Sequence, residues 1–190
     1  MDDYTLLDDW KNRRLYVNDL ITDDIVDVIS MNIIKFNQED KNVPITERKP
    51  IIIYLNTPGG NISPGFSAID TMLSSKTPVY TVNLGICYSM GFLLFISGKK
   101  RFSLKNSTFL LHDGSDGMVA SAAKAMDYMQ FSEKQMNVRI KDHVLNHTTI
   151  PEKLYEEKYR IEWYMYPEEA KKYGICTDIV GEDCDIDSII

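Results

Sequence analysis

Segments whose apolar residues fit a strand alternate along the chain with segments whose apolar residues fit a helix. The segments PIIIYLN (50–56) and TPVYTVNLG (77–85) are largely apolar and rich in β-branched residues, as is typical of strands buried on both faces of a parallel sheet. After the first of these segments, Phe66, Ile69 and Met72 recur at helical spacing. This alternation of strands and helices predicts an α/β fold.

The remaining segments continue the alternation. Residues 14–17 are predicted to form a strand, and Thr22 is placed as the N-cap of a helix because acidic residues follow it. The polar stretch 37–49 contains a proline and is predicted to be a loop. Pro167 in the first turn and Gly174 as C-cap bound the last helix. Further strands are predicted at 101–104 and 108–112, and further helices at 89–98 and from Pro151 onward.

A long helical stretch is predicted from Val119 to His147. Its apolar positions lie roughly on one face: Met126, Met129, Met136, Ile140 and Val144. A helix of this length exceeds the average in a compact domain. We therefore expect it to project from the domain and to pack against another element, such as a second subunit.

Composition and charge narrow the class of protein. The 190 residues fit a single domain spanning 1–190, with a short N-terminal segment at 1–14 and an extended region at about 113–150. Apolar residues make up 44% of the chain and charged residues 26%, which is enough for a folded core. The net charge of −7 argues against a nucleic-acid partner.

Cysteine usage and the absence of long apolar runs indicate a cytoplasmic protein. Cys87, Cys176 and Cys184 are odd in number and form no CxxC pair, so neither a disulfide framework nor a zinc site is expected. The acidic start MDDYTLLDDW is unlike a secretory signal, and no apolar run is long enough to span a membrane.

Three features with chemical potential follow predicted strands. The pair Gly59-Gly60 follows one strand, Ser89 begins the helix after the next, and His112 ends a third. Strand ends near helix starts are common ligand sites in α/β sheets, and acyl transfer needs a hydroxyl nucleophile, a base and oxyanion donors. Taken singly, each feature also fits a structural role: a serine that eases helix packing, a core or surface histidine, and a turn.

Four separate segments nevertheless resemble one family. The chain from about Leu15 to Val180 resembles the proteolytic subunit of the Clp protease, ClpP, with the motifs in the same order. The matching segments are TPGGNISPGFSAIDTM (57–72), GICYSMGFLLFISGKKR (85–101), NSTFLLHDG (106–114) and YMYPEEAKKYGICTDIV (164–180).

The resemblance implies a serine peptidase of the ClpP/crotonase-like fold, built from repeated β-β-α units with a projecting handle helix. It assigns Ser89 as nucleophile and His112 as base, and it assigns the backbone N–H groups of Gly60 and Met90 as the oxyanion hole. The position of the third catalytic residue is occupied by Glu162, where the family normally has Asp. No metal and no other cofactor is implied.

The resemblance also implies assembly, with three departures. The family forms heptameric rings, often stacked, that cleave unfolded polypeptides or peptides in an oligomeric chamber fed by an AAA+ unfoldase. Only Met1 to Tyr4 remain here for the loop that engages the unfoldase, which leaves that partner open. DGSDGMVASAAKAM (113–126) only partly keeps the Gly-rich strand that interlocks two rings, and 37–49 is longer than the corresponding turn. These departures indicate a divergent, phage-type or accessory member.

Two further functions stay open. A non-proteolytic ClpP-like scaffold or accessory subunit would fit the short N-terminal segment and the exchange of Asp for Glu162. A crotonase-type enzyme would hold an acyl-CoA thioester in the same oxyanion pocket, although it would not need the pair Ser89 and His112.

Overall fold

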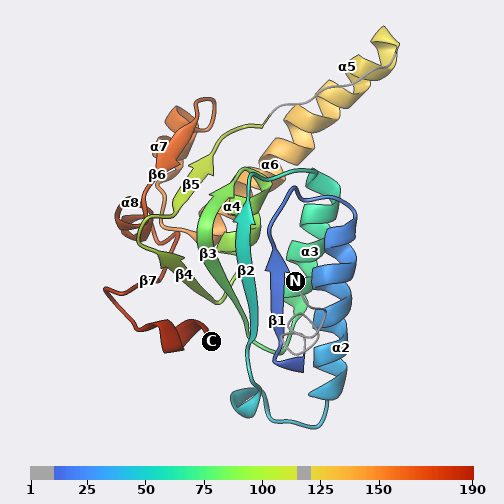
Figure 1. The fold of residues 1–190 in the computed structure, drawn as a ribbon. Helices are drawn as coiled ribbons and strands as arrows, with labels where there is room; N and C mark the ends of the chain where they lie inside the picture. The colour runs from blue at the N-terminus through green and yellow to red at the C-terminus, as the bar shows by residue number, and fades with distance from the viewer. Residues whose placement is uncertain (1–10, 115–120) are drawn as a thin grey trace.

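The computed structural model describes residues 11–114 and 121–190, which form a sheet flanked by helices (Figure 1). Within these residues the sheet has seven strands, in the order β1-β2-β3-β4-β7, with β5 beside β3 and β6 beside β5. All pairs are parallel except β5 with β6. The predicted α/β fold with a parallel sheet is confirmed. The strands are β1 (Arg14–Val17), β2 (Ile51–Thr57), β3 (Val79–Tyr88), β4 (Lys100–Leu104), β5 (Thr108–Leu111), β6 (Trp163–Met165) and β7 (Asp178–Val180).

The helices lie mainly on one face of the sheet, where α2 and α3 run side by side (Figure 1). Helix α4 packs against both α3 and α6. No helix in the described part of the chain is both long and apolar enough to cross a membrane. The helices are η1 (Val26–Met31), α2 (Asn32–Glu39), η2 (Ile45–Glu47), α3 (Ile62–Ser74), α4 (Met90–Ile96), α5 (Ala122–Phe131), η3 (Ser132–Met136), α6 (Asn137–His147), α7 (Glu152–Lys158), α8 (Pro167–Lys172) and η4 (Ile186–Ile189).

Strand β3 is longer than predicted and divides the sheet. Its first half pairs with β4, and its last residues, from Ile86 to Tyr88, pair with β5. Asn83 lies at the division, where its side-chain amide donates to the carbonyl of Thr108 at 3.0 Å. The sequence pattern ended this strand at Gly85, whereas the structure continues it to Tyr88. Ser89 is therefore the first residue beyond the strand.

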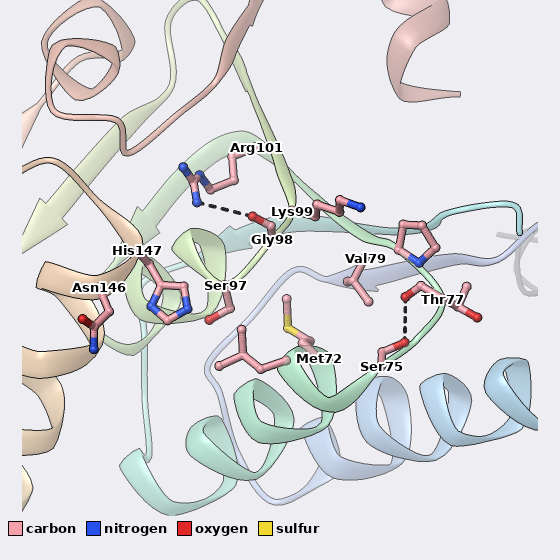
Figure 2. A pocket seen from close by; sticks show the side chains of 12 residues that line it. Met72, Ser75, Thr77, Val79, Ser97, Gly98, Lys99, Arg101, Asn146 and His147 are labelled. Atoms are coloured by element: carbon pink, nitrogen blue, oxygen red, sulfur yellow. Dashed lines mark hydrogen bonds between the residues drawn. The ribbon is translucent and has the colours of Figure 1, made fainter. Parts of the chain in front are cut away.

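The predicted loop at 37–49 begins too early. Residues 37–39 belong to α2. The Asn37 side chain stabilises this end of the helix: it donates to the carbonyl of Ile33 at 2.9 Å and accepts from the backbone N–H of Thr77 at 3.2 Å. The next turn is held in the same way: the Ser75 hydroxyl donates to the carbonyl of Thr77 at 2.7 Å (Figure 2). The first residues of the predicted loop thus extend α2, whereas residues 40–49 form turns, irregular structure and the short helix η2, as a loop would.

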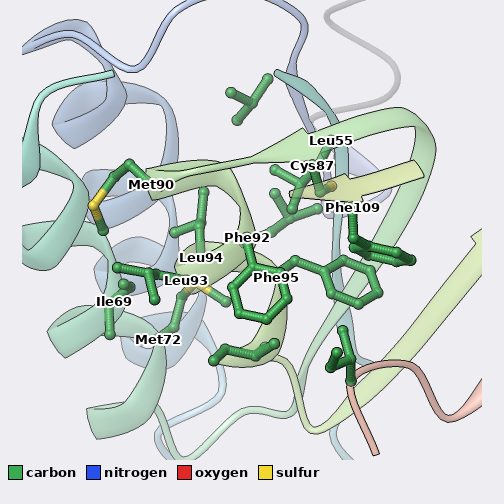
Figure 3. Packing of buried hydrophobic residues seen from close by; sticks show 14 of the residues in the cluster. Leu55, Ile69, Met72, Cys87, Met90, Phe92, Leu93, Leu94, Phe95 and Phe109 are labelled. Atoms are coloured by element: carbon green, nitrogen blue, oxygen red, sulfur yellow. The ribbon is translucent and has the colours of Figure 1, made fainter. Parts of the chain in front are cut away.

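The main core lies between the sheet and the helices (Figure 3). Every residue of α4 is buried, as expected for a helix that is apolar on all sides. The rings of Phe95 in α4 and Phe109 in β5 lie 4.9 Å apart between centroids. This packing fixes α4 against the end of the sheet from which Ser89 projects.

A second, smaller cluster covers the other face of the sheet. Its members are Ile52, Tyr54, Val82, Phe102 and Ile189. The hydroxyl of Tyr54 donates to the carbonyl of Ile189. The short helix η4 thus lies over this face, which the sequence pattern did not predict.

The segments α5, η3 and α6 follow one another without a break from residue 122 to 147, and we call them the projecting helix. Figure 1 shows it extending away from the sheet, as predicted. The predicted apolar face is only partly buried: Val144 is fully buried, whereas Met126 and Met129 are 61% and 65% exposed. Val119, the predicted start, lies outside the described residues.

The ends of α8 are as predicted. Pro167 occupies the first turn, and Gly174 follows the helix with a φ of 64°. The N–H of Gly174 donates to Lys171 at 3.0 Å, and the N–H of Ile175 donates to Ala170 at 2.9 Å, which together form a Schellman motif. The three-residue strands β6 and β7 were not predicted, because so short a segment carries no periodicity.

A buried ion pair connects the start of β1 to the end of α2. The guanidinium of Arg13 donates two hydrogen bonds of 2.6 Å to the carboxylate of Asp40, which is 5% exposed. The hydroxyl of Thr77 donates to the same carboxylate at 2.8 Å. The hydrogen bonds from Arg13 hold the pKa of Asp40 below its usual value.

We predict that Asp40→Asn lowers the free energy of unfolding at pH 7 by about 3 kcal/mol, because Arg13 then loses its buried counterion. A carboxyl with a lowered folded-state pKa stabilises the fold above its unfolded pKa, and this stabilisation is lost as the pH falls through the folded value. The difference between the two proteins should therefore narrow below about pH 4. Urea denaturation of both proteins at several pH values measures this difference in the free energy of unfolding.

Glu39→Gln is the matched control for this prediction. Its carboxylate lies 4.0 Å from Arg13 and is 49% exposed, so we expect a change below about 1 kcal/mol. Equal losses in the two variants would contradict the assignment of the buried pair.

Candidate active site

Ser89 lies in a strained turn between β3 and α4. Its φ of 54° and ψ of −120° are sparsely populated by residues other than glycine, and Arg13 is the one other such residue with positive φ in the described part of the chain. The Ser89 N–H donates to Leu110 at 3.0 Å, and its carbonyl accepts from Phe92 at 3.0 Å. A sharp strand-to-helix turn of this kind presents a serine hydroxyl at the edge of a sheet.

Glycines allow neighbouring backbone segments to approach this turn closely. A Cβ on Gly59 would lie 2.8 Å from Cβ of Ser89 and 2.7 Å from the carbonyl oxygen of Tyr88, and the φ of Gly59 is 101°. A Cβ on Gly91 would lie 2.5 Å from the side chain of Thr57. The end of β2 and the start of α4 therefore approach as closely as backbones can.

The turn after β2 continues along the same edge of the sheet. The N–H of Ile21 donates to Gly59, and the N–H of Asn61 donates to Ile21, each at 2.8 Å. These bonds hold the backbone on both sides of Gly60. The φ of Gly60 is 149°, and a Cβ at this position would lie 2.3 Å from the carbonyl oxygen of Ile21. Beside it, Met90 begins α4, and its backbone nitrogen lies 3.1 Å from the Cβ position of Gly59. Of the two expected oxyanion donors, Met90 directly follows Ser89, and Gly60 follows Gly59, whose Cβ position lies 2.8 Å from Cβ of Ser89.

Ser89, His112 and Gly60 line the same cleft, which has a volume of about 740 Å³. The reason lies in the topology: β2, β3 and β5 are neighbouring parallel strands, so the residues after them meet at one edge of the sheet. The start of α3 and the projecting helix form the other walls. They contribute Asn61, Ile62, Ser63, Pro64, Tyr128, Phe131, Ser132, Met136 and Asn137.

His112 follows β5 directly and is partly exposed. Its Nε2 atom is buried and has no hydrogen-bond partner among the described residues. A buried ring nitrogen without a partner is costly in a purely structural histidine. It is suited to accept a proton from a hydroxyl in the cleft, and such pairs often tighten only when substrate binds.

Glu162 is not among the residues that line the cleft. It precedes β6, whose antiparallel register ends with Trp163 opposite Leu111; continued by one position, this register would place Glu162 across from His112. The carboxylate of Glu162 accepts a hydrogen bond of 2.9 Å from the hydroxyl of Tyr164. The predicted third residue thus has Tyr164 as its hydrogen-bond partner in this structure.

Cys87 is excluded as a nucleophile by its burial. Its side chain is fully buried, and burial raises the pKa of its thiol well above the usual value. A neutral, inaccessible thiol does not attack a carbonyl. No group of three or more His, Cys, Asp or Glu side chains in residues 11–114 and 121–190 is arranged to hold a metal ion.

A second Ser–His pair, which the sequence pattern did not predict, lies at the far end of α4. The hydroxyl of Ser97 lies 3.1 Å from Nε2 of His143 and donates to the carbonyl of Leu93 at 2.8 Å. Both residues are buried, and burial lowers the pKa of His143 to about 4. The hydroxyl proton is already engaged by a carbonyl, so this pair joins α4 to α6 instead of forming a site.

A cavity of about 480 Å³ lies beside that pair, between Thr77, Ser97, Arg101 and His147 (Figure 2). The guanidinium of Arg101 donates to the carbonyls of Ile96 at 3.1 Å and of Gly174 at 2.8 Å. These bonds tie helix ends to the sheet. The cleft that contains Ser89 and His112 is therefore the better candidate for chemistry.

Similarity to known proteins agrees with this choice. The Clp protease family matches the chain over residues 2–183. A protein of Frankia casuarinae, named ATP-dependent Clp protease proteolytic subunit 1, is 31% identical over 177 residues, which are 90% of this chain and 78% of that protein. Both matches include the segments that carry Ser89 and His112, and the chain belongs to the Clp protease family.

Proposed function

We propose that the whole chain is one peptidase domain, a serine endopeptidase subunit that cleaves unfolded polypeptides or peptides inside an oligomeric chamber. The observation that carries the proposal is the strained Ser89 turn in the same cleft as His112, whose Nε2 has no hydrogen-bond partner within residues 11–114 and 121–190. Family membership supports the same reaction class.

In this proposal Ser89 attacks the scissile carbonyl while Nε2 of His112 takes the hydroxyl proton. The N–H groups of Gly60 and Met90 stabilise the oxyanion, and each such donor contributes about 3–4 kcal/mol to the transition state. His112 then gives its proton to the leaving amine, and water hydrolyses the acyl-enzyme by the reverse sequence. Glu162 orients His112.

Assembly forms part of the proposal. The exposed apolar side chains Met126, Met129 and Phe131 lie on the projecting helix, and burying them against another copy would remove apolar area from water. We propose a homo-oligomer, a heptameric ring or stacked rings. The similar Frankia protein is named as an ATP-dependent subunit, and we propose an AAA+ unfoldase as the partner that supplies substrate here.

A second function has its own support. The hydroxyl of Tyr164 donates to the Glu162 carboxylate, and Nε2 of His112 has no hydrogen-bond partner in the part of the chain that the structure describes. A non-proteolytic scaffold or accessory subunit would tolerate both features. Labelling of Ser89 and cleavage assays separate the two functions.

We predict that a fluorophosphonate probe labels the protein on Ser89 and that Ser89→Ala abolishes both labelling and casein cleavage. Ser97→Ala is the matched control, because it removes the hydroxyl of the buried Ser–His pair and should leave labelling intact. Mass spectrometry of the labelled peptide identifies the site. An unlabelled protein in every oligomeric state would favour the scaffold.

We predict that Gly59→Ala slows labelling of Ser89 by roughly a hundredfold, because the added Cβ would displace the nucleophile. Gly181→Ala is the control: it also has a positive φ, of 89°, but its Cβ would meet nothing within 4 Å. Each variant should lose about 1 kcal/mol or more of stability from backbone strain. Equal labelling rates would show that Gly59 does not position Ser89.

We predict that Met129→Asp on the projecting helix weakens self-association by at least about tenfold, because it places a charge in a surface that assembly would bury. Gln130→Asp, at the neighbouring exposed position, should weaken it less. Sedimentation velocity measures the mass distribution. If both variants keep the wild-type mass, the assembly surface lies elsewhere.

A further inference from the structure

Tyr164 lies in β6, which pairs with β5, the strand that ends just before His112. Across three strands, Tyr88, Leu110 and Tyr164 form one row by register. The rings of Tyr88 and Tyr164 pack edge to face with centroids 5.7 Å apart, and the Tyr88 hydroxyl lies 2.7 Å from Oγ1 of Thr108. The contact with Tyr88 thus supports one side of the Tyr164 ring, which is 52% exposed.

The hydroxyl of Tyr164 points along its own strand to Glu162. The two residues are separated by one position, so their side chains share a face of the sheet, and the O–H donates to the carboxylate at 2.9 Å. A tyrosine phenol has a usual pKa of about 10 and is protonated at neutral pH, so it can donate this bond; the hydrogen bond to the carboxylate raises the pKa of Tyr164 further.

His112 is the second candidate partner of Glu162. The antiparallel register of β5 with β6 ends with Leu111 opposite Trp163; continued by one residue, it would place Glu162 across from His112 and on the same face of the sheet. A glutamate side chain has one more rotatable bond than an aspartate, which lets its carboxylate reach along the strand or across it. One carboxylate thus has two candidate donors: the phenol that it contacts and an imidazole at the end of the neighbouring strand.

We propose that Tyr164 is a positioning residue that holds the Glu162 carboxylate away from His112, and that the triad assembles when the carboxylate exchanges the Tyr164 hydroxyl for the imidazole N–H. This inference rests on the proposed peptidase function. The exchange replaces one hydrogen bond to a carboxylate by another, so a small change in the surroundings decides the partner. Substrate or a neighbouring subunit at the cleft would supply such a change.

Other charged groups near His112 stay the same in all the variants below. Asp23 and Asp113 line the cleft with His112, and Arg160 interacts electrostatically with Asp113. Changes in the His112 titration between variants of residues 162 and 164 therefore isolate the Glu162 carboxylate.

The test is an NMR pH titration of the three histidines in the full chain. In Tyr164→Phe the ring on Tyr88 is kept but the donor is lost, so we expect the carboxylate to reach His112 and raise its pKa by about one unit. Adding Glu162→Gln should reverse this rise. Tyr166→Phe, a change at an exposed tyrosine two positions away, should leave the titration of His112 unchanged.

Labelling of Ser89 with fluorophosphonate gives the second readout. We expect Tyr164→Phe to label roughly tenfold faster than wild type and the double variant with Glu162→Gln to lose that gain. If no variant is labelled, the proposed peptidase function fails, and the titration still decides the role of Tyr164. An unchanged pKa of His112 in Tyr164→Phe overturns the inference.

The single variant Glu162→Gln tests the inference without altering Tyr164. With the carboxylate held by Tyr164, its loss should leave the His112 pKa at the wild-type value. A lowered pKa would show that Glu162 already contacts His112, which also overturns the proposal.

Discussion

The close approach of two strand-to-helix turns is the constraint on which the candidate site depends. Gly59 ends one turn and Ser89 forms the other, and a Cβ on Gly59 would lie within 2.8 Å of Cβ of Ser89. Because β2 and β3 are adjacent and parallel, both turns lie at one edge of the sheet. A side chain at Gly59 would therefore force the two turns apart and displace Ser89.

The two Ser–His pairs of this chain show how burial decides between structure and chemistry. Ser97 and His143 lie within hydrogen-bond distance, yet they are buried and saturated by the carbonyl of Leu93. Ser89 and His112 line one cleft, and Nε2 of the histidine has no hydrogen-bond partner among the residues that the structure describes. Proximity of a serine and a histidine is thus a weaker sign of catalysis than access to the cleft combined with unsatisfied hydrogen-bonding capacity.

Much of the fold could be predicted because strong local signals agree with the tertiary structure. The apolar run of β2 and the Pro167 and Gly174 boundaries of α8 are examples, and they follow from burial on two faces and from backbone conformations. The continuation of β3 past Gly85 could not be predicted, because the glycine is there to make room: a Cβ would lie 2.6 Å from Asn56. That requirement comes from a neighbouring strand.

One part of the candidate site could also be predicted from the sequence, and another part could not. Strand order and turns bring Ser89, His112 and Gly60 into one cleft, and sequence motifs are sufficient to predict residues that the backbone places. The partner of Glu162 could not be predicted, because the hydrogen bond that its carboxylate accepts from Tyr164 depends on side-chain geometry. The sequence identifies Glu162 and its place beside β6, but it does not determine which rotamer the side chain adopts.

The apolar residues that follow Ser89 are what allow its strained turn to persist. A seven-residue helix such as α4 has little stability of its own, so the turn would relax if α4 were free to move. Burying Phe92 and Phe95 contributes roughly 2–3 kcal/mol each, whereas a residue in a sparsely populated conformation costs about 1–3 kcal/mol. The burial exceeds the strain, and the helix therefore holds Ser89 in a conformation that the isolated segment would leave.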